Sequence, residues 1–143
     1  MNSFRFPLQK VLDWRQTQLE LEEARFKQQL AALAALDAEH AALEAAGIKA
    51  EIQVRDWSAL DGSDLAALGS FRLRVKQKEE QNDIRRRECR SHLEAQQSAM
   101  LEARRRCRLL ERLKDRRRAE WQSAQDRELE QLASESFLAK WAK

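Results

Sequence analysis

The chain has 143 residues, of which 43% are hydrophobic and 36% are charged, with three Gly, one Pro and no Tyr. Most of it is Ala, Leu, Glu, Gln, Arg and Lys, which favour helices because they lose little side-chain freedom there. This composition argues against a compact single-core domain. The chain has no apolar run of the roughly 20 residues that a membrane span needs, and its N-terminus lacks the apolar core of a signal peptide.

The first predicted helix covers residues 8–56. It starts after Pro7, which fits the first turn of a helix because its missing N–H would be unpaired there. A seven-residue repeat predicts the buried stripe of this helix; it comprises Leu12, Leu19, Phe26, Leu33, His40, Gly47 and Val54. The companion row holds Leu8, Leu36 and Leu43 but also Arg15, Glu22 and Gln29. We therefore expect a seam that is partly solvated or faces another protein. Gly47 is a competing end for this helix.

A turn is predicted over residues 57–63, where the only Asp-Gly pair of the chain occurs. Gly62 follows Asp61, and the next two residues, Ser63 and Asp64, are both good helix N-caps.

The second predicted helix covers residues 64–138 and contains no Pro. One seven-residue row comprises Leu68, Val75, Asn82, Cys89, Gln96, Ala103 and Leu110, and its companion row includes Leu65, Leu93, Met100, Cys107 and Trp121. Polar residues also enter these rows, namely Asn82, Gln96, Arg72, Glu79 and Arg86. Such residues can fix the register of a coiled coil at a cost in stability, so this seam is expected to be the weaker one.

The short connection predicts that the two helices fold back on each other. The expected fold is all-α, a single antiparallel coiled-coil hairpin over residues 1–143. At the standard rise the helices would be about 73 Å and about 112 Å long, so the second overhangs the first. Leu8 should lie opposite residue 112, and the overhang from Leu113 onward would carry Arg116, Arg117, Arg118, Trp121, Leu129, Leu132, Phe137 and Trp141.

Sites for catalysis, metals or cofactors are not indicated by the sequence. Cys89 and Cys107 are 18 residues apart on one predicted helix, about 27 Å at the standard rise, so they cannot form a disulfide with each other. His40 and His92 are isolated, and we interpret His40 as a seam residue or a partner contact rather than a metal ligand. A rod of two helices also offers no enclosed pocket that would perturb the pKa of a carboxylate. We expect a protein that is not an enzyme and has no cofactor.

Positive charge is concentrated in the second predicted helix. Residues 1–56 carry a net charge of −2 and residues 57–143 a net charge of +5. Three Arg triplets stand out, at 85–87, 104–106 and 116–118. Consecutive helical residues point about 100° apart, so each triplet spreads its charge around the helix. Three interpretations stay open: a solvated surface, an acidic protein partner, and nucleic acid, for which no groove-reading motif is present.

A family resemblance rests on three stretches. Residues 4–15, Phe-Arg-Phe-Pro-Leu-Gln-Lys-Val-Leu-Asp-Trp-Arg, resemble the N-terminal Phe-x-Phe-x-Leu-x-x-Val-Leu pattern of the FliJ family, small proteins of the flagellar type III export apparatus. Residues 63–71 resemble the start of that family's second helix, and residues 110–121 resemble its basic C-terminal block.

This resemblance implies a non-enzymatic, stalk-like coiled coil of bacterial flagellum biogenesis and motility. Its implied partners are the hexameric export ATPase (FliI), the export gate (FlhA) and the export chaperones that it escorts. The implied location is cytoplasmic, at the inner face of the membrane through these partners only, with no specific nucleic acid. A basic coiled-coil nucleic-acid binder and a generic scaffold are the alternatives.

Two contact regions follow for such a stalk. The free helix ends would contact the ATPase ring through Phe4, Phe6, Leu8, Leu12, Leu110, Leu113, Arg116, Arg117, Arg118 and Trp121. Near the turn, Phe71, Val75 and Asn82 can share one helix face. They are interpreted either as part of the hairpin core or as a contact with the export gate.

Overall fold

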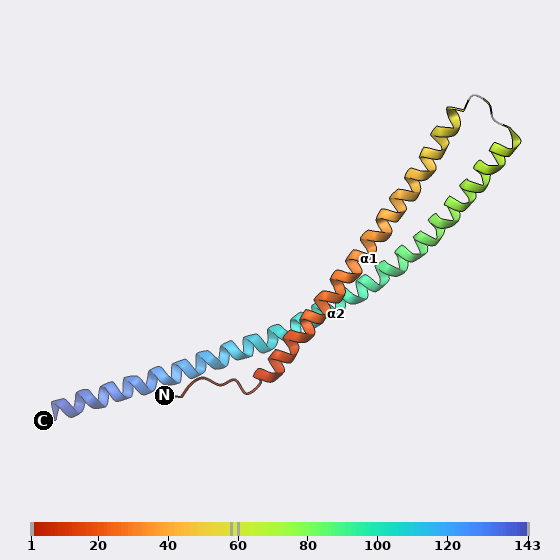
Figure 1. Cartoon of the computed structure of the whole chain (residues 1–143). Coiled ribbons are helices and arrows are strands. Elements are labelled where there is room, and N and C mark those ends of the chain that lie inside the picture. Colours follow the sequence, from red (N-terminus) through yellow and green to blue (C-terminus); the bar gives the residue numbers. More distant parts are fainter. Residues whose placement is uncertain (1, 58, 60, 143) are drawn as a thin grey trace. The chain divides into compact units, whose positions relative to one another are not determined.

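The computed structural model describes residues 2–57, 59 and 61–142, and in these residues it contains two helices and no strand. Helix α1 spans Gln9–Arg55 and helix α2 spans Gly62–Trp141 (Figure 1). The predicted all-α fold with two long helices is confirmed. The contacts of the chain divide it into two units, one comprising Met1–Leu21 with Leu101–Lys143 and the other comprising Glu22–Met100.

The helix boundaries differ slightly from the predicted ranges of 8–56 and 64–138. Helix α2 begins at Gly62 because Asp61, rather than Ser63 or Asp64, is its N-cap. The Asp61 carboxylate accepts a hydrogen bond from the Asp64 N–H at 2.8 Å, and the Asp64 carboxylate accepts one from the Asp61 N–H at 3.4 Å. This reciprocal pair is a capping box. Of the predicted turn, Ser58 and Leu60 lie outside the described residues.

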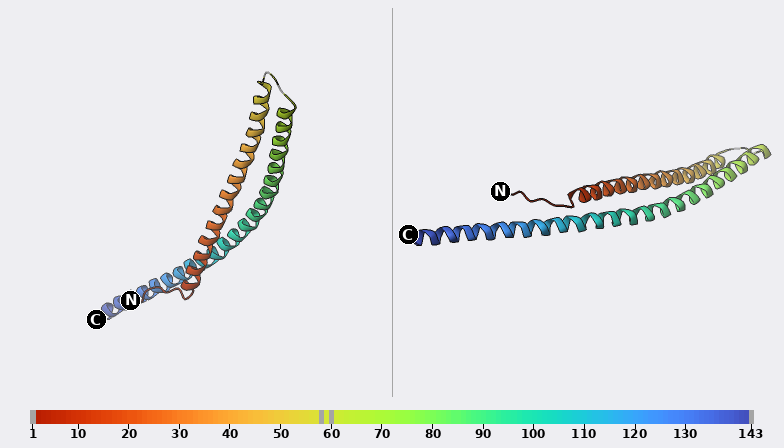
Figure 2. Two further views of the ribbon diagram at one scale, coloured as in Figure 1. Left: turned by 45° about the vertical axis from the view of Figure 1, so that its right-hand side comes forward. Right: turned by 90° about the horizontal axis from the view of Figure 1, so that it is seen from below.

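In the unit Glu22–Met100, α1 and α2 pair in antiparallel fashion, and both views of Figure 2 show them side by side. Three contacts define the register: Asn82 with Leu36, Cys89 with Gln29, and Gln96 with Glu22. Each step of seven residues forward in α2 corresponds to seven residues back in α1. This register agrees with a turn centred near residue 60, as the sequence predicts.

Burial in this unit follows the predicted rows except near the start of α2. Leu65 and Arg72 were expected on the companion row, yet both are exposed, Leu65 at 54%, whereas Asp64 and Phe71 are partly buried. From Glu79 onward the partly buried positions follow the predicted companion row. The spacing between inward positions is thus four residues twice in succession, from Phe71 to Val75 and from Val75 to Glu79. This local irregularity shifts Leu65 to the outside.

In the other unit, a small hydrophobic core lies at the start of α1. Phe6, Leu12 and Cys107 are buried, at 9%, 2% and 2% exposure. The partly buried side chains packed against them are Phe4, Leu19, Leu110 and Leu113. Beyond residue 125 every described residue of α2 is exposed. The predicted overhang is present, but it begins later than Leu113, because residues 2–8 also contact α2. No helix of the described residues has an apolar stretch long enough to cross a bilayer.

Candidate functional site

The residues preceding α1, 2–8, form what we call the N-terminal arm. Pro7 lies in a turn in which the Gln9 N–H donates to the Phe6 carbonyl at 3.1 Å. This turn directs Phe6 onto α2, where it joins Leu12 and Cys107 in the core. The Phe-x-Phe-Pro stretch of the sequence therefore fastens the arm to the second helix.

Phe4 extends the arm further along α2. Its ring lies 6.1 Å from the ring of Trp121, centroid to centroid, and the two planes are inclined by 53°. The guanidinium carbon of Arg118 lies 5.6 Å from the centre of the Phe4 ring. Tilted aromatic pairs and cations over ring faces are both attractive arrangements. Phe4, Trp121 and Arg118 thus form one aromatic and cationic cluster, which we call the arm cluster.

A cavity of about 400 Å³ lies beside the arm cluster. Its lining is mostly apolar but includes two Arg, and it consists of Phe4, Arg5, Phe6, Pro7, Leu8, Leu113, Arg117 and Trp121. Leu8 is 40% exposed, and Arg116, Arg117 and Arg118 are exposed. An incoming side chain would therefore meet apolar walls and guanidinium groups together.

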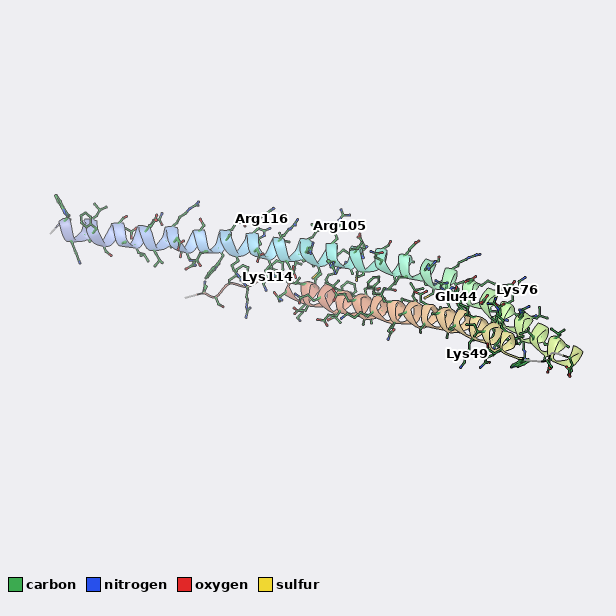
Figure 3. The ribbon with its side chains drawn as sticks, turned by 90° about the horizontal axis from the view of Figure 1, so that it is seen from above. Glu44, Lys49, Lys76, Arg105, Lys114 and Arg116 are labelled. Atoms are coloured by element: carbon green, nitrogen blue, oxygen red, sulfur yellow. The ribbon has the colours of Figure 1, made fainter. Side chains whose placement is uncertain are left out.

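The structure brings nine of the ten predicted ring-contact residues to the side of α2 that meets the arm, but they differ in accessibility. Arg116 lies on the opposite side of α2 (Figure 3). Leu12 is 2% exposed, so it supports the region from within and cannot touch a partner. Phe6 is also buried, and Leu110 and Leu113 are partly buried. The residues left on this side to meet a partner are Phe4, Leu8, Trp121, Arg117 and Arg118, while Arg116 is exposed on the opposite side of the helix.

The three residues predicted to contact the export gate differ in how exposed their side chains are. Asn82 is 1% exposed, and its amide Nδ2 donates to the Leu36 carbonyl at 3.1 Å. Val75 packs toward Gly47, at which an added Cβ would lie 3.9 Å from Val75 Cγ1. Phe71 is partly buried and lines an open groove of about 450 Å³ together with Trp57. The prediction that Asn82 meets a partner is therefore corrected, since its side chain is used between the helices, and Phe71 is the accessible member.

Asn82 belongs to a regular set of polar contacts that we call the polar ladder. Cys89 Sγ donates to the Gln29 carbonyl at 3.8 Å, and Gln96 Nε2 donates to the Glu22 carbonyl at 3.3 Å and also contacts the Glu22 carboxylate. With Asn82, the three donors are spaced seven residues apart in α2, and so are their acceptors in α1. The sequence places these residues in the seam, but it does not show that they bind backbone carbonyls.

Charged residues at the margin of the seam also pair across it. Arg86 contacts Asp37 at 2.8 Å and Asp83 at 3.5 Å, and its side chain is 19% exposed. Arg72 contacts Glu51 at 3.4 Å in a more exposed position. The polar positions that made the second seam look weak are therefore largely matched by partners on α1.

The chemistry of the remaining polar groups is limited. His40 Nε2 contacts the Glu44 carboxylate at 3.1 Å, while its Nδ1 is buried without a hydrogen-bond partner. Burial raises the pKa of the Cys107 thiol, and the carboxylate of Glu111, 3.6 Å from the sulfur, raises this pKa further. Across the ranges that the structure describes, no three His, Cys, Asp or Glu side chains gather to hold a metal ion.

Comparison with known proteins gives no relative: no protein-family model, curated protein or solved structure matches the chain.

Proposed function

We propose that the chain is a non-enzymatic, stalk-like coiled coil of the FliJ type in a flagellar type III export apparatus. In this proposal it binds the hexameric export ATPase (FliI) and stimulates it, contacts the export gate (FlhA), and escorts export chaperones. It reaches the membrane only through these partners. The observation that carries the proposal is the arm cluster, in which Phe4, Trp121 and Arg118 lie together at the free end of the hairpin.

The composition of this end suits a protein contact. Aromatic residues and Arg supply most of the binding energy at many protein interfaces, because they combine a large apolar area with directional polar groups. Here the Phe4 ring is already held against Trp121 and Arg118, so less side-chain freedom is lost when a partner binds. The three exposed Arg of 116–118 add a positive rim that would favour an acidic surface and accelerate association.

A stalk must also resist twisting if it is to act inside a ring. The polar ladder and the Arg86–Asp37 pair join α1 to α2 by directional bonds, in addition to the apolar rows. These bonds oppose rotation of one helix against the other. This support is mechanical and does not depend on any chemical reaction of the chain.

The proposal is tested by ATPase stimulation in a purified system. We expect that Arg116→Glu with Arg117→Glu and Arg118→Glu abolishes stimulation of the export ATPase, because it reverses the charge of the rim. The matched control is Arg85→Glu with Arg87→Glu and Arg90→Glu, which changes the charge equally at three exposed positions outside this region. Helical content by circular dichroism should stay the same in both variants.

The outcomes separate the functions considered. Loss of stimulation in the first variant alone supports the proposal. Unchanged stimulation would remove the assignment of Arg116, Arg117 and Arg118. Failure of the unaltered chain to bind the ATPase, combined with binding to any DNA duplex that falls steeply with salt, would favour the nucleic-acid alternative.

A further inference from the structure

A second surface lies on the side of α2 away from the arm. We call it the outer face. Its members are exposed and follow one another at intervals of three, four or seven residues, which places them on one side of the helix. They are Leu101, Arg105, Arg108, Arg112, Ala119, Asp126, Glu130 and Phe137. Figure 3 shows Arg105 and Arg116 on the side of α2 opposite Lys114. Trp121, which contacts the arm, is seven residues after Lys114 and so belongs to the Lys114 side by helical spacing.

The N-terminal part of the outer face is hollowed. A groove of about 310 Å³ is lined by two apolar residues and four guanidinium groups, namely Leu101, Arg104, Arg105, Arg108, Leu109 and Arg112. Leu101 and Leu109 are 49% and 56% exposed, although they are large apolar side chains. The groove is therefore suited to an apolar side chain flanked by carboxylates.

The same helix carries the complementary chemistry further along. Residues 101–118 hold nine Lys or Arg and three Asp or Glu, a net charge of +6, whereas residues 120–137 hold one Arg and five Asp or Glu, a net charge of −4. The acidic half also exposes large apolar side chains, including Leu129 at 57%, Leu132 at 61% and Phe137 at 62%. Two adjoining stretches of 18 residues thus have opposite charge.

These two halves cannot meet within one chain. Helix α2 is continuous from Gly62 to Trp141, and Arg108 and Glu130 are 22 residues apart on it. At the standard rise this separation is about 33 Å along the axis, far beyond the reach of an ion pair. The complementarity can be satisfied only by another molecule.

We propose that this molecule is a second copy of the chain, bound antiparallel along the outer face. An alignment with Ala119 opposite Ala119 of the second copy places oppositely charged or apolar residues across from each other. Arg108 then faces Glu130, Arg112 faces Asp126, and Leu101 faces Phe137. Because the arrangement has a two-fold axis, each of these pairs occurs twice.

The alignment is physically consistent in three respects. Ala119 at the axis is small and lets the two backbones approach closely. Phe137 of the second copy reaches the groove beside Leu101 and Arg105, where a guanidinium can lie over its ring. A parallel alignment is disfavoured, because the segment 101–118 of one copy, with a net charge of +6, would then face the same segment of the other copy.

The inference goes beyond the proposed function and uses a different surface. The arm cluster contains Phe4 and Trp121, whereas the outer face has its charged pairs at Arg108, Arg112, Asp126 and Glu130. Variants of these four residues therefore test the second copy without altering the arm cluster.

The test uses two charge-reversed full-length variants. Variant one is Arg108→Glu with Arg112→Glu, and variant two is Asp126→Arg with Glu130→Arg. Each variant alone places like charges across the two-fold axis, whereas a mixture of the two restores opposite charges at every pair. The control is Arg85→Glu with Arg87→Glu, which makes the same charge change in the other unit.

Association is measured by analytical ultracentrifugation at about 100 μM, where a complex of micromolar affinity is saturated. The unaltered chain and the control should sediment at about twice 16.7 kDa. Each variant alone should sediment as a monomer, and an equal mixture should recover the dimer. Circular dichroism of each variant shows whether α2 is still formed.

Three outcomes would overturn the inference: a monomeric unaltered chain at this concentration, variants that still dimerise alone, or a mixture that stays monomeric while both variants are helical. Binding of the unaltered monomer to an acidic helix of another protein through Arg108 and Arg112 would identify a different occupant of the outer face.

Discussion

Replacing Asn82 by Leu should stabilise the hairpin, although the substitution removes a hydrogen bond. Asn82 is 1% exposed; its Nδ2 donates to the Leu36 carbonyl at 3.1 Å, and its Oδ1 is buried with no partner. A buried acceptor without a partner costs about 1–3 kcal/mol, whereas a neutral hydrogen bond contributes about 0.5–1.5 kcal/mol net. The Leu36 carbonyl keeps its acceptor role within α1. Asn82→Leu should therefore raise the free energy of unfolding by about 1 kcal/mol.

The opposite sign is expected for Asn82→Ala. This variant also removes the unpaired Oδ1, but it leaves a void between the helices that Leu would fill. We expect a loss of about 1 kcal/mol in the free energy of unfolding, because buried truncations lose contacts that the surroundings do not replace. The expected order of stability is Leu above Asn above Ala at position 82.

The assay is urea unfolding monitored by circular dichroism at the helical band. The midpoints of the variants are compared where the dependence of the unfolding free energy on urea concentration is the same. Gln81→Leu is the matched control, because residue 81 is exposed on the same helix, and its effect should stay within about 0.5 kcal/mol. A decrease of more than about 1 kcal/mol for Asn82→Leu would refute the reasoning, since the hydrogen bond would then outweigh the cost of the unpaired oxygen.

Three further predictions concern other residues. Gln29→Cys should be cross-linked to Cys89 within one chain by a short bifunctional thiol reagent, seen as a shift in gel mobility without reductant, because the two positions face each other; a purely intermolecular product would contradict the register. Alkylation of Cys107, followed by peptide mass spectrometry, should be slow at neutral pH and accelerate above pH 9, because its raised pKa leaves little thiolate, and Glu111→Gln should accelerate it by removing a negative charge. An unchanged rate in Glu111→Gln would show that the carboxylate has no influence on the thiol. Under the proposed function, Phe71→Ala should weaken binding to the export gate with little change in thermal stability, whereas a large drop in the unfolding temperature would assign Phe71 to the core.

The pairing of the helices could be predicted because it depends on regular repeats. Rows such as Leu12 to Val54 and Leu68 to Leu110 repeat every seven residues, and a short turn near residue 60 leaves one antiparallel alignment for them. The exposed apolar end of α2 was predictable for the same reason, since the helices differ in length. Leu65 was misplaced because a local change from three- to four-residue spacing breaks the repeat there.

Contacts of non-repeating segments could not be derived in this way. The position of the N-terminal arm depends on a turn at Pro7 and on which helix face Phe4 and Phe6 reach, and neither follows from a heptad pattern. The start of α2 depends on whether Asp61, Ser63 or Asp64 is the N-cap, and all three residue types are good caps. The polar ladder depends on the close approach of two backbones, which the side-chain pattern does not report.

The polar ladder has a consequence for how the helices can move past each other. Each of its donors bonds to a backbone carbonyl, which every residue of α1 offers, and only Gln96 also contacts a side chain, the carboxylate of Glu22. A slide of α1 by seven residues would bring Asn82, Cys89 and Gln96 opposite new carbonyls on the same face of α1, so the three bonds could form again. The ladder is therefore compatible with alternative registers that differ by seven residues, and the short connection between the helices selects one of them.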